Sequence, residues 1–257
     1  IRIAAQTLNN GRLVAFPTET VYGLGANALD ADALKRIYLA KKRPATDPII
    51  AHIAHNEQLN TLAVNIPPIA HELAQAFWPG ALTLVLERAP DVPETIAAGL
   101  STVAVRMPAH PIARILLETA VVPVAEDSAN TFTRPSATTA AHVLQDLNGR
   151  VDVILDGGAT TIGVESTVLD LTGESPIILR PGGVVIEDLR PIIPRVELAP
   201  KYLGRATHAS SPGQMLKHYS PDARVMLFNG DDDARIIAHM QDNANRLTSV
   251  HKRVGIL

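Results

Sequence analysis

Short apolar runs alternate with helical periodicity along most of this chain, and that alternation limits the fold more tightly than any other feature. Continuous apolar runs of this length are typical of strands that are buried on both faces. We predict strands at Leu13–Phe16, Ile49–Ile53, Leu82–Leu86, Val103–Met107, Val121–Val124, Val151–Leu155, Thr167–Leu171 and Ile177–Leu179. Strands interspersed with helices indicate an α/β fold with a mixed sheet, whose strand order the pattern leaves open.

Four helices are predicted between these strands. Asp30 can cap a helix whose Leu34, Ile37 and Tyr38 form one apolar stripe, and this helix must stop before Pro44. The other three are predicted at Pro67–Phe77, Pro111–Thr119 and Thr138–Leu147.

Periodicity disappears between about residues 193 and 221, where prolines punctuate the sequence. We therefore predict a main domain at 1–192, a linker at 193–221 and the start of a further domain at 222–257. The last part reads as strand, helix and strand, at Arg224–Phe228, Asp231–Leu247 and Arg253–Leu257, and is too short to be stable alone.

The composition excludes several classes of protein. A net charge of -3 argues against a protein that grips nucleic acid mainly by neutralising phosphates. The lack of cysteine excludes disulfides, thiolate catalysis and cysteine-based zinc sites. No apolar run reaches the length of a membrane span. We expect a soluble, cytoplasmic protein, and the start at Ile1 suggests a sequence trimmed at its ends.

A basic run closes the first predicted helix, with five Lys and Arg residues between Lys35 and Arg43. Cations at a helix C-terminus are favoured by the helix dipole, so a solvated helix end is the ordinary interpretation. Lys41, however, continues the inward stripe seven residues after Leu34, where a charge must be paired or lie over a cleft. Arg43 could offer a planar fork to a phosphate. Both interpretations remain open on these residues alone.

Small polar side chains also gather at three strand ends, where α/β proteins usually place ligand sites. The segments are 16–25, 128–130 and 163–167, and each could equally be a turn shaped by Pro and Gly. Neither a Walker A motif nor a dinucleotide-binding fingerprint is present. The nine histidines are scattered, so no metal site is predicted.

Six ordered motifs together resemble the threonylcarbamoyl-AMP synthase family, with its YrdC-type domain. The match covers roughly residues 1 to 190, and the segment Ser211-Pro212-Gly213 with His218-Tyr219-Ser220-Pro221 resembles the linker of the long, two-domain form. The motifs are Pro17-Thr18-Glu19-Thr20-Val21-Tyr22-Gly23-Leu24, Lys41-x-Arg43-Pro44, Thr102-Val103-Ala104-Val105-Arg106-x-Pro108, Ser128-Ala129-Asn130, Gly163-Val164-Glu165-Ser166-Thr167 and Leu179-Arg180-Pro181-Gly182-Gly183.

The resemblance implies a YrdC-like open, twisted mixed sheet around a large, positively lined cavity, followed by a linker and part of a Rossmann-like domain. It assigns the catalytic role to Lys41, Arg43, Ser128 and Asn130. ATP would be bound by Lys41, Arg43, Asp47, Thr102, Asn130, Thr138, Arg180 and the linker residue Tyr219. L-threonine would be bound by Thr20, His52, Arg106, Ser128 and Ser166, with Arg106 facing the carboxylate.

The same resemblance implies the reaction. The threonine amine captures bicarbonate or CO2 as a carbamate, which attacks the α-phosphorus of ATP and expels pyrophosphate. Mg2+ would enter with ATP, held through the phosphates, and no protein metal site is expected. Partner proteins would transfer the threonylcarbamoyl group to tRNA, with no stable tRNA binding by this chain and no membrane contact.

The sequence departs from the family pattern in two segments. Asp47 stands where Asn is usual, and a carboxylate beside a triphosphate is unfavourable unless a cation lies between them. Glu126-Asp127 precede Ser128 where a small residue and Pro are usual, so the loop conformation could differ.

Three other functions compete with the synthase. A related domain of hydrogenase-maturation proteins makes a carbamoyl adenylate, but its companion cysteine-rich segments are absent. An RNA-binding module conflicts with the acidic balance. An interaction domain with vestigial motifs conflicts with the presence of Lys41, Arg43 and Asn130.

Overall fold

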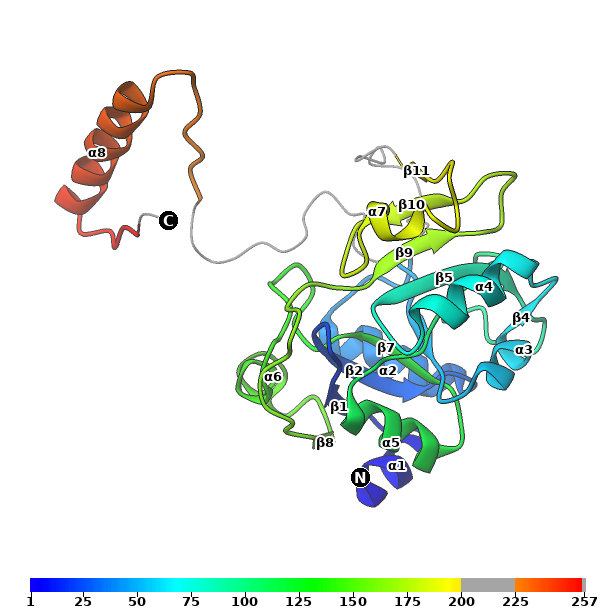
Figure 1. Ribbon diagram of the computed structural model, residues 1–257. Coiled ribbons are helices and arrows are strands. Elements are labelled where there is room, and N and C mark those ends of the chain that lie inside the picture. Colours follow the sequence, from blue (N-terminus) through cyan, green and yellow to red (C-terminus); the bar gives the residue numbers. More distant parts are fainter. Residues whose placement is uncertain (200–224, 256–257) are drawn as a thin grey trace. The chain divides into compact units, whose positions relative to one another are not determined.

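The computed structural model describes residues 1–199 and 225–255, and the chain divides into two compact units, Ile1–Ser220 and Pro221–Leu257. The first unit contains a mixed sheet and its covering helices (Figure 1). The described helices are α1 (Arg2–Asn9), α2 (Ala31–Lys41), η1 (Asn56–Gln58), α3 (Leu59–Leu62), α4 (Pro68–Phe77), α5 (Pro111–Ala120), α6 (Ala140–Leu147), α7 (Ile186–Leu189) and α8 (Asp233–Ser249). The strands are β1 (Val14–Pro17), β2 (Tyr22–Asn27), β3 (Ile50–His52), β4 (Ala63–Val64), β5 (Leu82–Arg88), β6 (Thr102–Arg106), β7 (Val124–Ser128), β8 (Val153–Ile154), β9 (Thr167–Asp170), β10 (Ile177–Arg180) and β11 (Glu197–Leu198).

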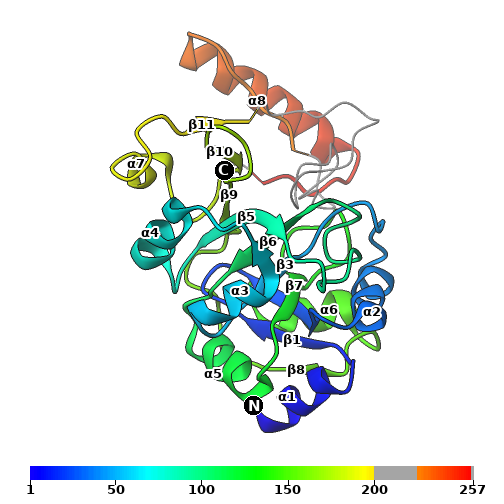
Figure 2. The same cartoon turned by 90° about the vertical axis from the view of Figure 1, so that its right-hand side faces the viewer.

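The strands join in the order β11-β10-β9-β5-β6-β3-β7-β2-β1-β8, with β4 paired to β5 beside this path. Figure 2 shows this succession from β8 at one end of the sheet toward β10 at the other. Parallel pairs (β3 with β6, β5 with β9) stand among antiparallel ones (β2 with β7, β5 with β6). The predicted mixed α/β sheet is therefore confirmed.

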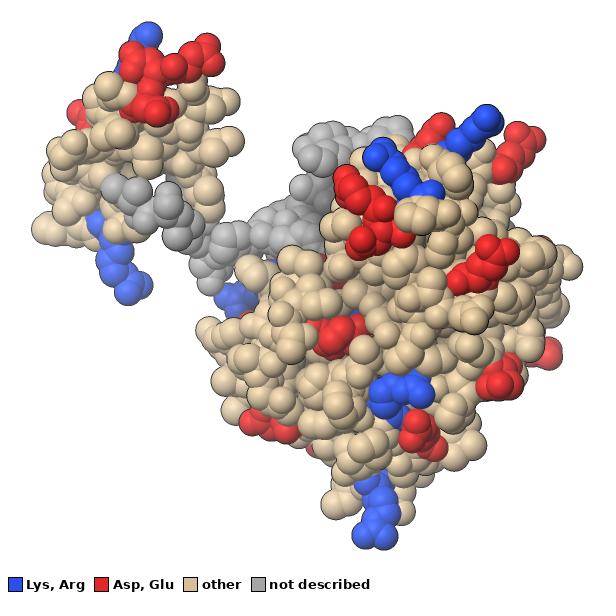
Figure 3. All heavy atoms as spheres, viewed as in Figure 1, with Lys and Arg blue, Asp and Glu red and all other residues tan. Residues whose placement is uncertain are grey.

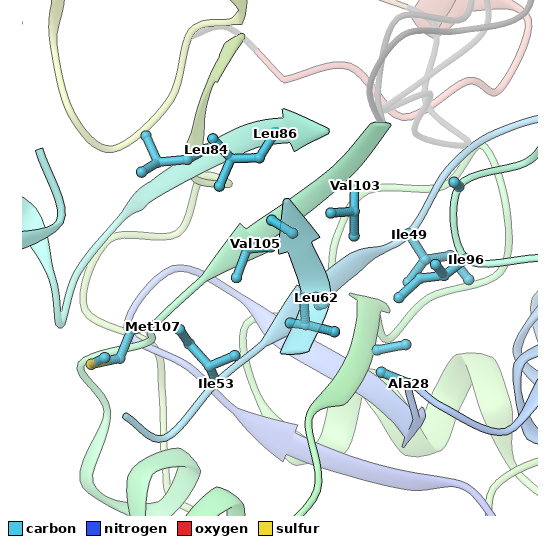
Figure 4. Packing of buried hydrophobic residues seen from close by; sticks show 14 of the residues in the cluster. Ala28, Ile49, Ile53, Leu62, Leu84, Leu86, Ile96, Val103, Val105 and Met107 are labelled. Carbon is cyan, nitrogen blue, oxygen red and sulfur yellow. The ribbon is translucent and has the colours of Figure 1, made fainter. Parts of the chain in front are cut away.

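The core lies on both sides of this sheet. The larger cluster includes Leu84 and Leu86 of β5 and Val103 and Val105 of β6, which contribute to the packing seen in Figure 4. A second cluster joins α1 and α5 to Phe16 of β1, and these two helices lie side by side in Figure 1. Burial on two faces explains why the strand sequences are nearly continuous apolar runs.

The strand predicted at Val121–Val124 is wrong in its position, because β7 spans Val124–Ser128. Val121 ends α5 in the left-handed region, with φ 62°, so it cannot begin a strand. The true strand carries Glu126 and Asp127, whose charges interrupt the apolar pattern. Sequence periodicity cannot reveal a strand whose charged residues are neutralised by partners that are distant in the sequence.

Two elements near the N-terminus were not predicted, namely helix α1 and strand β2. A turn was one of two interpretations of residues 16–25, but Tyr22–Asn27 pairs with both β1 and β7. Gly23 permits this pairing, since a Cβ there would lie 2.1 Å from Oε1 of Glu126. The glycines belong to the middle of a sheet rather than to a turn.

The second unit is described from residue 225 to 255. Helix α8 confirms the predicted helix, and Asp232 caps it by accepting a hydrogen bond from the Arg235 N–H. The strands predicted on either side are wrong where they are described, because 225–228 and 253–255 form no strand. Within the predicted linker, Glu197–Leu198 forms β11 beside β10. Over the described ranges, no helix is long and apolar enough to cross a membrane.

Candidate functional site

The end of α2 turns two basic side chains inward. Asp30 caps the helix by accepting hydrogen bonds from the N–H groups of Asp32 and Ala33. At the other end, Lys42 adopts the left-handed conformation with φ 56°. Lys41 and Arg43 are consequently buried, whereas Lys42 between them is exposed. The solvated helix end considered for this run applies to Lys42 but not to its neighbours.

Two carboxylates neutralise this buried pair. Lys41 Nζ lies 2.9 Å from Asp127 Oδ2, and Arg43 Nη1 contacts the same oxygen. Arg43 Nη2 lies 2.8 Å from Asp47 Oδ2 and donates to the Pro48 carbonyl at 2.8 Å. We name Lys41, Arg43, Asp47 and Asp127 the four-charge cluster. Its side chains are at most 8% exposed, so the charges stabilise one another with little water.

The two carboxylates of the cluster differ in acidity. Burial raises the pKa of Asp127, but Arg43 and Lys41 outweigh burial and hold that pKa well below its usual range. Burial raises the pKa of Asp47 to about 6, because desolvation outweighs the attraction of Arg43. Burial also lowers the pKa of Lys41, against the opposing attraction of Asp127. Asp127 is thus the firmly ionised member of the cluster, and Asp47 the one closest to protonation.

Ser128 and Asn130 lie beside this cluster. Lys41 Nζ contacts the Ser128 carbonyl and lies 3.2 Å from its Oγ. Asn130 Nδ2 donates to the carbonyls of Thr131 and Arg134, at 3.0 and 2.8 Å. Its Oδ1 is buried and has no hydrogen-bond partner among the described residues. The predicted catalytic set therefore gathers at the end of α2 and β7.

A second basic site is built around Arg106 at the end of β6. Its Nη1 donates to Thr20 Oγ1 at 3.0 Å, its Nε donates to the Gly80 carbonyl at 3.0 Å, and its Nη2 contacts Glu19. Glu19 also accepts a hydrogen bond from the Ala109 N–H at 2.9 Å. Burial raises the pKa of Glu19, but Arg106 and these hydrogen bonds lower it overall. The structure thus brings together the predicted threonine ligands Arg106 and Thr20.

His52 belongs to the same face of the sheet as Arg106. The parallel pairing of β3 with β6 sets His52 opposite Arg106, so the two side chains project together. His52 Nε2 lies 2.9 Å from Glu126 Oε2, and both side chains are buried. Sequence reasoning missed Glu126 as a site residue, although its charge inside an otherwise apolar region was the signal.

Ser166 and Arg180 are also brought together. Arg180 donates from Nε and Nη2 to the Ser166 carbonyl, at 3.1 and 2.9 Å. The Ser166 hydroxyl lies 2.7 Å from Thr83 Oγ1, a residue that the sequence did not single out. In the antiparallel pairing of β5 with β6, Leu84 faces Val105, so Thr83 comes next to Arg106. Ser166 is thereby linked to the Arg106 region.

Two further predicted ATP contacts, Thr102 and Thr138, have other surroundings. Thr102 lies in a pocket of about 360 Å³, and Thr138 Oγ1 lies 3.2 Å from His142 Nδ1 near the start of α6. Tyr219 and its predicted closure over the nucleotide lie outside the described residues. No group of three or more His, Asp or Glu side chains that could hold a metal ion occurs in the described part of the chain. The pocket at Thr102 is lined by Asn65, Pro67, Leu86, Glu87, Ser101, Leu171 and Thr172.

Comparisons with known proteins match the chain from end to end. The family model described as "Telomere recombination" matches residues 6–182, and that described as "Threonylcarbamoyl-AMP synthase, C-terminal domain" matches residues 184–257. The threonylcarbamoyl-AMP synthase of Pyrococcus abyssi is 49% identical over 258 residues, covering 100% of this chain and 76% of the relative. That of Bacillus subtilis is 44% identical over 255 residues, covering 99% and 72%.

A solved structure agrees with these matches. The crystal structure of P. abyssi Sua5 complexed with L-threonine superposes with a TM-score of 0.93 at 49% identity, covering 100% of this chain and 75% of that one. The fold and the ordered motifs define a YrdC-like α/β protein. This chain belongs to the threonylcarbamoyl-AMP synthase family.

Proposed function

We propose that this protein forms threonylcarbamoyl-AMP and pyrophosphate from L-threonine, bicarbonate or CO2, and ATP. The observation that carries the proposal is the match of the whole chain to threonylcarbamoyl-AMP synthases at 44–49% identity. The geometry supports it, because Lys41 and Arg43 lie together at the end of α2, and Arg106 and His52 lie together on the sheet. Two separate basic sites suit a reaction that must bring two anionic ligands together.

In this proposal Arg106 binds the threonine carboxylate, with Thr20, His52 and Ser166 beside it. Charge-assisted bonds from a guanidinium fork suit a carboxylate. Lys41 and Arg43 bind the phosphates of ATP, while Ser128 and Asn130 position the reacting groups. Thr102, Thr138, Arg180 and Tyr219 stay predicted ATP contacts. Mg2+ would accompany the phosphates and neutralise charge as pyrophosphate leaves.

The reaction asks mainly for positioning and charge neutralisation. The neutral threonine amine attacks bicarbonate and releases water, which gives a carbamate. A carbamate oxygen then bonds to the α-phosphorus of ATP as the bond to pyrophosphate breaks. Partner proteins would pass the threonylcarbamoyl group to an adenosine beside the tRNA anticodon. A cytoplasmic location stays a prediction.

The chain's surface does not favour the alternative of an RNA-binding module. On the face shown in Figure 3, acidic and basic side chains are interspersed, and the net charge is -3. A protein that holds RNA electrostatically usually presents a basic stripe. The carbamoyl-adenylate alternative is disfavoured by the whole-chain match to threonylcarbamoyl-AMP synthases.

Pyrophosphate release from ATP tests the proposed function. We expect release only when L-threonine and bicarbonate are both present, since the nucleophile is their adduct. Serine should give a lower kcat/KM than threonine, by a factor that corresponds to about 1–3 kcal/mol of transition-state binding, because one methyl group provides no more discrimination than that. Release without threonine, or with carbamoyl phosphate in place of both substrates, would contradict the proposal.

A further inference from the structure

The guanidinium of Arg43 is already occupied on both of its outer nitrogens. Nη1 contacts Asp127, and Nη2 pairs with Asp47 and donates to the Pro48 carbonyl. Nε is buried and has no hydrogen-bond partner within the described ranges. A phosphate cannot accept a fork of two hydrogen bonds from Nη1 and Nη2 while both carboxylates stay in place. One contact of Arg43 must therefore change before a phosphate is bound in that way.

The two carboxylates are held with different strength. Asp127 contacts Lys41 and Arg43 together, so its displacement would leave two buried cations unpaired. Asp47 pairs with Arg43 alone among the described residues. Asp47 is fully buried at 0% exposure, so bulk solvent does not stabilise its charge. Of the two, Asp47 is the less stabilised anion.

We propose that Asp47 is an internal counter-anion of Arg43 which a phosphate ligand displaces, while Asp127 keeps Lys41 and Arg43 in place. This inference rests on the proposed function only in identifying the phosphate ligand as ATP. The arrival of a polyanion beside Asp47 brings like charges together in a place of low water content. Asp47 therefore opposes ligand binding as long as it is ionised, and sets how tightly phosphates bind.

Protonation offers Asp47 a way to lose its charge. The charged groups that face it are Arg43, Asp127 and Lys41, and the Tyr38 hydroxyl donates to its backbone carbonyl at 3.2 Å. Its pKa of about 6 leaves it mostly ionised at pH 7. Negative phosphates nearby raise that pKa further, so binding at pH 7 should favour proton uptake by Asp47.

Calorimetric titration of the full chain with inorganic pyrophosphate, and separately with Mg2+ and ATP, tests the inference. Asp47→Asn keeps the shape of the side chain and removes its charge. We expect about tenfold tighter binding of both ligands by this variant, as for a gain near 1.4 kcal/mol. Asp188→Asn, at an exposed position of α7, changes the net charge equally and should leave both affinities unchanged.

Proton uptake compared between the unmodified chain and Asp47→Asn supplies a second test. Titrations at pH 7 in two buffers of different ionisation enthalpy should show more uptake for the chain itself than for Asp47→Asn, since protonation changes of the ligand are common to both. Equal or weaker binding by Asp47→Asn would overturn the inference, because Asp47 would then assist the ligand, for example through a bridging cation. Equal proton uptake by the unmodified chain and Asp47→Asn would overturn it too.

These outcomes are distinct from failure of the proposed function. If pyrophosphate release from ATP depends on threonine and bicarbonate but Asp47→Asn binds no tighter, only the inference fails. If the chain does not turn over ATP but Asp47→Asn binds inorganic pyrophosphate more tightly, the inference about Asp47 holds and the proposed function fails.

Discussion

Arg43, just after α2, and Arg106, at the end of β6, are two buried arginines that both pair with carboxylates of the same chain. Among the described residues Arg106 pairs with one carboxylate, Glu19, which also accepts a hydrogen bond from the Ala109 N–H. In the same part of the chain Arg43 pairs with two, of which Asp127 also contacts Lys41 whereas the Asp47 carboxylate pairs with Arg43 alone. The pKa of Glu19 is lowered and that of Asp47 is raised. We therefore expect the Arg106–Glu19 pair to stay in place when ligand binds and the Arg43–Asp47 pair to be displaced.

The largest effect should follow the loss of Asp127. Asp127→Ala leaves Lys41 without its carboxylate and Arg43 with only Asp47, inside a region nearly free of water. We expect about 3–5 kcal/mol less unfolding free energy in urea denaturation, the usual result of breaking a buried ion pair. A loss below about 1 kcal/mol would mean that water or other groups satisfy these cations.

A smaller effect should appear in the pH dependence of Asp47. Its pKa rises from 3.8 to about 6 on folding, so the folded state binds more protons than the unfolded state between these values. Stability should therefore fall as pH rises from about 4 to 6, by at most roughly 3 kcal/mol. Asp47→Asn should lack this fall, so its advantage over the unmodified chain grows with pH. An advantage that shrinks with pH would show that Asp47 stabilises as an anion.

The smallest effect is expected at Glu19. Glu19→Gln keeps an oxygen for the Ala109 N–H but removes the charge that faces Arg106. We expect a loss of about 1.5 kcal/mol in urea denaturation, typical of one charge-assisted hydrogen bond. Because the pKa of Glu19 is lowered, its contribution is present above the ordinary carboxyl pKa and fades as pH falls below it. A gain in stability at pH 7 would make Glu19 resemble Asp47 and abolish the contrast.

The same contrast explains what could be predicted from the sequence. Apolar periodicity located most strands and the helices α2, α4, α5 and α6, because those elements are defined by the side chains they bury. It misplaced β7, since Glu126 and Asp127 make that strand look polar, and it missed β2, whose glycines resemble a turn. These errors fall where side chains from distant segments meet.

The sequence identified residues of the candidate site but not the contacts among them. Lys41 was expected inside because it continues a helical stripe, and the structure buries it. Asp47 is only four residues from Arg43, but nothing in the sequence spacing could show that Asp127 of β7 converges on the same guanidinium. Of the residues that depart from the family pattern, Asp47 and Asp127 are counter-ions of the Lys41-x-Arg43 motif, and Glu126 is the partner of His52.

Separate titrations with ATP and with L-threonine test the central claim, that Arg43 and Arg106 serve different ligands. Circular dichroism would first establish that Arg43→Ala and Arg106→Ala are folded. We predict that Arg43→Ala weakens ATP by about 10- to 100-fold and leaves threonine nearly unchanged, and that Arg106→Ala does the reverse, each having lost a charge-assisted contact. The opposite pattern, or equal losses of both ligands in each variant, would contradict the assignment.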